Sequence, residues 1–109
     1  MIVDFSLNRP SARIRPALVV QNDRDNSRTT QTIVVQITTN LSRAGIDTQV
    51  SIDSSNPDWA KSGLRAPSVI NCSSLASIDT QDILRTIGNL SPATLQQIDD
   101  CLRSVLDLK

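Results

Sequence analysis

Two arginines and a proline stand directly before an apolar run in the segment ARIRPALVVQND, residues 12–23: Arg13, Arg15 and Pro16. Arginine stays charged and forms forked hydrogen bonds to phosphate oxygens. The permanent charge of arginine suits the negative charge that develops in a phosphorane-like transition state. Because the guanidinium stays protonated, arginine is a poor general base. These residues therefore favour chemistry on a phosphate group. The alternative is that Arg15 is an ordinary cation at the start of a strand.

Other kinds of catalytic site lack their residues in this chain. It contains no histidine, and all eleven acidic residues are aspartates that form no recognisable ligand cluster. This disfavours a metal site and excludes a histidine-assisted nucleophile. The three glycines, Gly45, Gly63 and Gly88, form no phosphate-binding loop, and an aromatic stacking platform is excluded because only Phe5 and Trp59 are aromatic. We therefore expect no metal and no cofactor.

Charge is distributed unevenly, although the whole chain has a formal net charge of zero. Residues 1–45 hold six arginines against three aspartates, and the remainder holds five cations against eight aspartates. This asymmetry indicates an anionic partner for the first half, or else a solvated basic loop.

The length of 109 residues allows one domain, residues 1–109. No apolar run approaches the roughly 20 residues of a membrane span, and Asp4 interrupts the first apolar residues, so no signal peptide is expected. Cys72 and Cys101 are expected to be two buried thiols in a reducing compartment. We therefore predict a protein of the cytoplasm.

The first two-thirds of the chain is predicted to form strands. β-branched apolar density or alternation with a period of two marks them. The expected strands are Met1–Phe5, Arg15–Asn22, Gln31–Thr39, Thr48–Ile52 and Pro67–Ser73, with a further one at Leu75–Ile78. Pro16 belongs at a strand start or on an edge, and the polar segment Asp23–Thr30 should join the second and third strands as a hairpin.

The last third is predicted to be helical. Asp79 is a good N-cap for a helix Thr80–Ile87 that Gly88 would end. Ser91 then caps a longer helix with Pro92 at its first position. Its apolar stripe, Leu95, Ile98, Leu102, Val105 and Leu106, should pack on the strands or on a second subunit. Several short strands followed by two helices predict a mainly β protein, a small barrel with C-terminal helices.

Four segments resemble the MazF/PemK toxin family in order and spacing. They are RPALVVQND (15–23), IVVQITTN (33–40), SGLRAPSVINCSSLASID (62–79) and IGNLSPATLQQIDDCLRSVLDL (87–108). The short VDF at 3–5 is similar to the first strand of the family. The resemblance covers nearly the whole chain, and the RPALVV segment with the IT pair after it is its most specific part.

The resemblance implies an SH3-like barrel, usually a homodimer, that acts as a metal-independent endoribonuclease on single-stranded RNA. A cognate antitoxin, MazE-like, would hold it inactive. In the family the arginine before the proline and a threonine at the end of the following strand form the catalytic pair, which implies Arg15 and Thr38 here. The implied reaction is attack of an RNA 2′-OH on its neighbouring phosphate, with release of a 5′-OH fragment.

Four further residues are candidate RNA contacts. Arg13 would bind a flanking phosphate or remain solvated. Ser73 and Ser74 stand where relatives often carry a Glu-Gln pair near the RNA site. Trp59, expected in a loop over residues 54–63, would stack on a base, receive an antitoxin side chain or cap the barrel.

A second hypothesis keeps the barrel and removes the catalysis. The chain would then be a non-catalytic toxin similar to the CcdB gyrase inhibitors, or a degenerate toxin that serves as an interaction module. Fold alone does not decide between the two because function depends on the site.

Overall fold

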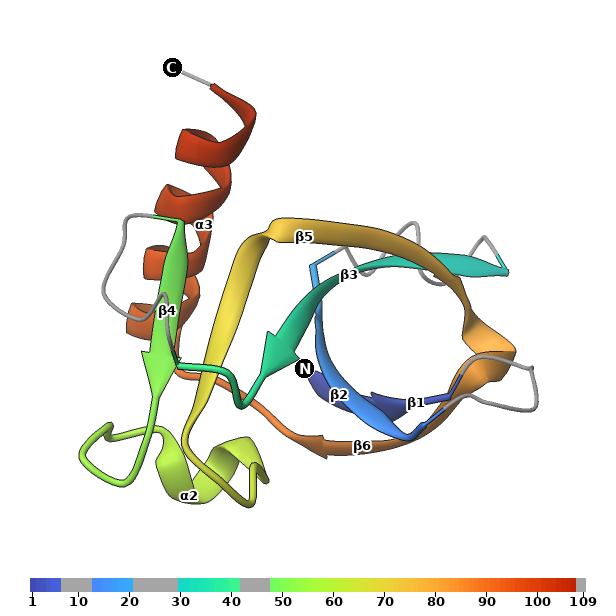
Figure 1. Ribbon diagram of the computed structural model, residues 1–109, viewed down its shortest axis with the longest axis horizontal. Helices are drawn as coiled ribbons and strands as arrows, with labels where there is room; N and C mark the ends of the chain where they lie inside the picture. Colours follow the sequence, from blue (N-terminus) through green and yellow to red (C-terminus); the bar gives the residue numbers. More distant parts are fainter. Residues whose placement is uncertain (7–12, 21–29, 42–47, 108–109) are drawn as a thin grey trace.

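The protein is described by a computed structural model that covers residues 1–6, 13–20, 30–41 and 48–107. Six antiparallel strands form one sheet in the order β4-β5-β3-β2-β1-β6. The strands are β1 (Ile2–Phe5), β2 (Arg15–Val19), β3 (Gln31–Thr38), β4 (Gln49–Ile52), β5 (Ser68–Asp79) and β6 (Ile83–Gly88). Figure 1 shows the sheet curling into a ring, with β5 above and β6 below β1. The mainly β class is confirmed, while β4 and β6 remain as sheet edges, so the barrel is not fully closed.

The first strands lie close to their predicted positions. β2 and β3 pair as an antiparallel hairpin, as expected, although most of the predicted connecting segment Asp23–Thr30 lies outside the described residues. β2 ends at Val19, earlier than predicted. Pro16 is the second residue of β2 and stands opposite Asp4 of β1. It thus occupies the strand start, where a missing N–H costs least.

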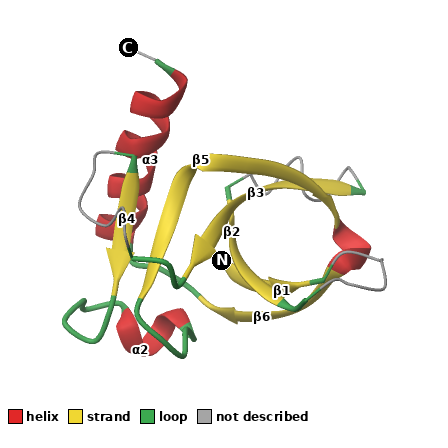
Figure 2. Cartoon of the chain, in the orientation of Figure 1, coloured by secondary structure: helices red, strands yellow, loops and turns green. Residues whose placement is uncertain are grey.

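The predicted helix Thr80–Ile87 is wrong. Asp79 does act as an N-cap, since its side chain accepts a hydrogen bond from the Gln81 N–H, but the helical part is only a 3₁₀ turn, Thr80–Asp82. Strand β6 follows at once and pairs with β1, which otherwise would expose one edge of a buried strand. Long-range pairing therefore overrides the local helix signal. Figure 2 shows that only the short turn between β5 and β6 remains helical.

The two strands predicted at Pro67–Ser73 and Leu75–Ile78 are one long strand, β5. Its pairing with β3 is interrupted once, because Gln36 stands opposite Asn71 and Val35 stands opposite Leu75. Cys72, Ser73 and Ser74 are therefore extra residues in β5 at this point. Such a bulge bends a strand, which fits the curvature of β5 around the ring (Figure 1).

Helix α3 (Pro92–Leu106) begins as predicted, with Ser91 as N-cap and Pro92 at the first position. It packs against β4 and β5. Ile98 is buried in the main core, Leu102 and Val105 are half-buried against it, and Leu95 and Leu106 are exposed. The predicted stripe therefore faces the sheet through its central members only. No helix of the described residues is long and apolar enough to cross a membrane.

A second helix, α2 (Trp59–Ser62), lies where a loop was expected. Trp59 opens it and packs half-buried against the main core. The two cysteines are free thiols: Cys72 is buried as predicted, whereas Cys101 is only half-buried.

Candidate active site

The register of the β2–β3 hairpin brings the two predicted catalytic residues to the same place. Ala17 stands opposite Gln36, Leu18 opposite Val35 and Val19 opposite Val34. Continuing this register by two residues sets Arg15, the first residue of β2, beside Thr38, the last residue of β3. Antiparallel neighbours directly opposite each other have Cβ atoms about 5 Å apart, within reach of one bound phosphate.

A hollow of about 340 Å³ lies over this end of the hairpin, and its lining includes Arg13, Arg15 and Thr38. Pro16 and Ser68 also line it. The hollow therefore combines two guanidinium groups with hydroxyl groups.

The charges of this hollow are unbalanced. Arg13 and Arg15 are both exposed, and neither forms an ion pair with any residue in the described part of the chain. Thr38 is half-buried, and its Oγ1 accepts a hydrogen bond from the backbone N–H of Asn40 at 3.1 Å. This contact orients the hydroxyl and leaves its proton available for donation. The hollow is thus suited to an anion with several oxygen acceptors.

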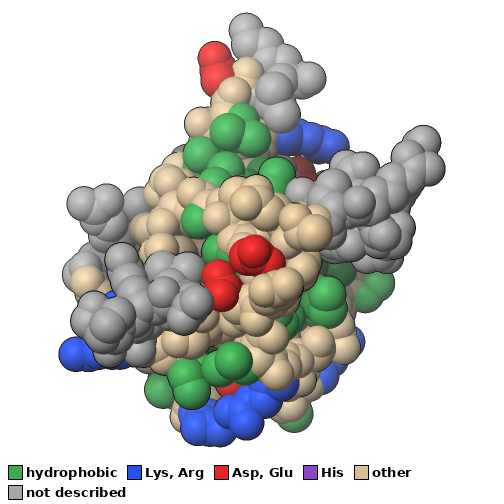
Figure 3. All heavy atoms as spheres, turned by 90° about the vertical axis from the view of Figure 1, so that its right-hand side faces the viewer, with side chains coloured by type: hydrophobic (Ala, Val, Ile, Leu, Met, Phe, Trp, Pro, Cys, Tyr) green, Lys and Arg blue, Asp and Glu red, His purple; other side chains and the backbone are tan. Residues whose placement is uncertain are grey.

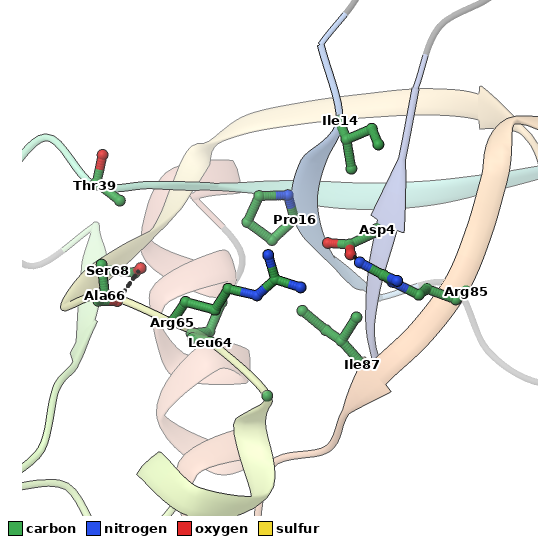
Figure 4. Close-up of a pocket in the computed structure, with 11 residues that line it drawn as sticks. Asp4, Ile14, Pro16, Thr39, Leu64, Arg65, Ala66, Ser68, Arg85 and Ile87 are labelled. Carbon is green, nitrogen blue, oxygen red and sulfur yellow. Dashed lines mark hydrogen bonds and ion pairs between the residues drawn. The ribbon is translucent and has the colours of Figure 1, made fainter.

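A second hollow, of about 530 Å³, adjoins the first (Figure 4). The two share Ile14, Pro16, Thr39 and Ser68 as lining residues. The second adds the side chains of Asp4, Arg65 and Arg85. Arg85 Nε donates to Asp4 Oδ2 at 2.9 Å, so these two charges compensate each other.

Sequence reasoning missed Asp4, Arg65 and Arg85. Asp4 and Arg85 are 81 positions apart and meet only because β6 pairs with β1. Because the sequence predicts a helix over residues 80–87, it gives no indication that this segment pairs with β1 as a strand. Arg65 lies between α2 and β5, with no local pattern around it that indicates a site.

The remaining predicted site residues line neither hollow. Ser73 is exposed at the bulge of β5, where Asn71 Oδ1 accepts hydrogen bonds from its N–H at 3.2 Å and its hydroxyl at 2.6 Å. Ser74 beside it is half-buried. Trp59 packs on the core, which favours its role as a cap over the other two expectations.

The surface around the β5–β6 corner also carries both signs of charge. Figure 3 looks onto that corner: aspartate side chains stand at its centre, and cationic side chains gather along its lower margin.

Comparison with known proteins identifies one class of protein. The family model for the PemK-like, MazF-like toxin of type II toxin–antitoxin systems matches residues 1–106. The chain belongs to this family, as the sequence resemblance indicated.

Individual relatives agree with this assignment. The chain is 34% identical over 99 residues to the endoribonuclease MazF9 of Mycobacterium tuberculosis, which covers 86% of this chain and 79% of that protein. It is 32% identical over 95 residues to the endoribonuclease EndoA of Bacillus subtilis, covering 87% and 78% of the two chains. In structure it is similar to the Mycobacterium tuberculosis toxin MazF-mt6, with a TM-score of 0.80, 27% identity and coverage of 99% and 97%.

These relatives also decide between the two functional hypotheses. The predicted toxin class is confirmed, and the named relatives are endoribonucleases. A gyrase inhibitor or non-catalytic module on the same fold is not favoured.

Proposed function

We propose that this chain is the toxin of a type II toxin–antitoxin system and cleaves single-stranded RNA with Arg15 and Thr38, without metal or cofactor. The observation that carries the proposal is that Arg15 and Thr38 line the same cationic hollow, at the end of β2 and β3 where the hairpin register, continued by two residues, sets them opposite each other. Membership of the family and the endoribonuclease relatives support the class of reaction.

In the proposed reaction the 2′-hydroxyl of one nucleotide loses its proton to solvent, and its oxygen bonds to the neighbouring phosphorus. The bond from phosphorus to the 5′-oxygen of the next nucleotide breaks, and that oxygen takes a proton from solvent. The products are a 2′,3′-cyclic phosphate and a 5′-OH. Arg15, unpaired among the described residues, stabilises the charge that develops on the phosphorane oxygens and donates a hydrogen bond to the leaving oxygen. Thr38 donates a hydrogen bond from its hydroxyl to a non-bridging oxygen or orients the 2′-OH.

Arg13 is proposed to bind a flanking phosphate, because it lines the same hollow and is exposed. Ser73 and Ser74 remain predicted RNA contacts on the outer surface of β5. Trp59 is proposed to act as a cap on the core rather than as a stacking residue.

The same assignment proposes the partners and the compartment. A toxin of this class requires a cognate antitoxin, MazE-like, and the protein is expected to form a homodimer in the cytoplasm, where its RNA substrate is present. An interaction with a short acidic antitoxin chain would suit the unpaired arginines of the site.

The test is incubation of the purified protein with a long single-stranded RNA in the presence of EDTA. Discrete cuts with 5′-OH ends are expected. Arg15→Ala and Thr38→Ala should each lower the rate by about 10²–10³. Arg103→Ala, an exposed change on α3 outside both hollows, serves as the control, and circular dichroism checks that all variants fold.

A 2′-deoxy substitution at a mapped cut site should prevent that cut, because it removes the nucleophile. Intact RNA with well-folded wild-type protein would refute the proposal and restore the non-catalytic alternative.

A further inference from the structure

Arg65 is the uncompensated cation of the second hollow. Of the three charged side chains that this hollow adds, Arg85 and Asp4 are paired at 2.9 Å, whereas Arg65 is exposed and has no ion pair within the described residues. Figure 4 shows its guanidinium pointing into the hollow, between Leu64 and the Asp4–Arg85 pair and toward Pro16. The net charge of the hollow is therefore positive.

The backbone that carries Arg65 is held in place on both sides. Gly63 has a φ of +73°, and a Cβ there would lie 1.9 Å from the carbonyl oxygen of Ile87 in β6. Leu64 is buried, and its N–H donates to Ser62 Oγ at 3.2 Å. On the other side Ser68 Oγ donates to the carbonyl of Ala66 at 2.8 Å. Arg65 thus extends from a fixed segment, which lowers the entropy cost of binding a ligand.

The wall of the second hollow combines apolar side chains with the charged side chains of Asp4, Arg65 and Arg85. Ile14, Pro16, Leu64 and Ile87 contribute the apolar part, and Ile14 is 61% exposed although it lies at the mouth of β2. An exposed apolar wall beside a free guanidinium suits a planar base joined to a phosphate. The volume of about 530 Å³ falls within the range of small-ligand sites.

The position of the hollow decides which nucleotide it would take. It shares Ile14, Pro16, Thr39 and Ser68 with the hollow that holds Arg15 and Thr38. An RNA strand whose scissile phosphate lies at Arg15 would therefore extend its next nucleotide across Pro16 toward Arg65.

We infer that the second hollow binds the nucleotide that flanks the scissile phosphate, with its base on Ile14 and Pro16 and its phosphate on Arg65. This inference rests on the proposed nuclease function. Arg65 is a positioning residue: it holds the substrate and does not touch the reacting atoms.

The probe is a short RNA that spans a mapped cut site and carries 2′-deoxyribose at the cleaved nucleotide, so that it binds without being cut. Fluorescence anisotropy gives its Kd at several salt concentrations for wild type, Arg65→Ala, Arg65→Lys and the control Arg103→Ala. Removing one phosphate contact should raise Kd about tenfold and lower the salt slope by about 0.7. Arg65→Lys should keep the wild-type slope because it keeps the charge, and Arg103→Ala should match wild type.

Cleavage kinetics provide the second measurement. The substrate is the same short RNA with ribose at the cleaved nucleotide, which the protein can cut. Arg65→Ala should raise KM and leave kcat within about twofold of wild type, since the contact is the same in the ground state and the transition state. Unchanged binding in Arg65→Ala, or an equal loss of slope in Arg65→Ala and Arg65→Lys, would overturn the subsite.

The experiments distinguish a wrong subsite assignment from a wrong nuclease assignment. A wild-type protein that cuts RNA while Arg65→Ala binds equally well overturns the subsite alone. A wild-type protein that neither cuts nor binds RNA overturns both proposals.

Discussion

Asp58 links α2 and α3, and the stability of the fold should depend on its side chain. It is only 3% exposed, and its Oδ2 accepts hydrogen bonds from the N–H of Ser91 at 2.8 Å and from the Ser91 hydroxyl at 2.9 Å. Ser91 is itself the N-cap of α3. Asp58→Ala therefore removes both bonds to Ser91 and leaves the Ser91 N–H without its acceptor.

The expected cost follows from these contacts. A hydrogen bond to a charged group contributes about 1.5–3 kcal/mol, and the two bonds share one oxygen, so we take the lower value for each. The free energy of unfolding should fall by about 3 kcal/mol, which corresponds to a loss of more than about 10 °C in Tm for a domain of this size. Asp58→Asn, which keeps one acceptor oxygen without the charge, should lose roughly half as much.

Asp58 also makes stability depend on pH. Hydrogen bonds from the Thr94 side chain and from Ser91 hold its pKa below the usual value of 3.8. The stabilisation is therefore fully present above that value and is lost as pH falls through the lower pKa of the folded state. The difference in stability between wild type and Asp58→Asn should shrink as the pH is lowered from about 6 toward about 3.

Urea unfolding at a fixed protein concentration measures these changes, with Asp99→Ala, at an exposed position on α3, as the control. An Asp58→Ala variant as stable as Asp99→Ala, or a difference between wild type and Asp58→Asn that does not change with pH, would refute the reasoning.

Two further predictions concern a glycine and the cysteines. Gly63→Ala should lower the free energy of unfolding in urea by more than about 2 kcal/mol. A positive φ costs an L-residue about 1–2 kcal/mol, and the new Cβ would also meet the Ile87 carbonyl oxygen. A change below about 0.5 kcal/mol, the size of a neutral surface substitution, would contradict the close packing of α2 against β6. Burial raises the pKa of the Cys72 thiol to about 12, so a thiol reagent at mildly alkaline pH should label the half-buried Cys101 first and Cys72 only on unfolding. Equal labelling rates for Cys101→Ser and Cys72→Ser in the native state would show that Cys72 is accessible.

Much of the fold is determined by local pattern. A short apolar start locates β1, a dense run of β-branched apolar residues locates β3, and period-two alternation locates β4, because each of these signals lies within the strand itself. Ser91 and Pro92 locate the start of α3 because their preferences act within one turn. The segments around Arg15 and Thr38 also identify the family, and the antiparallel pairing of β2 with β3 then brings both residues to one hollow.

Interactions between distant parts of the chain decided the rest. Ile83–Gly88 has a helix signal before it and a glycine at its end. It nevertheless becomes a strand because β1 offers it pairing partners 78 to 86 positions away in the sequence. Gly88 serves as a close-contact residue instead of a helix end, since a Cβ there would lie 2.2 Å from the Ser62 carbonyl oxygen. The second hollow exists only after this pairing, which brings Arg85 to Asp4 and β6 alongside the segment of Arg65. A sequence pattern reports the preferences of neighbouring residues, whereas these contacts depend on which strands meet in the folded sheet.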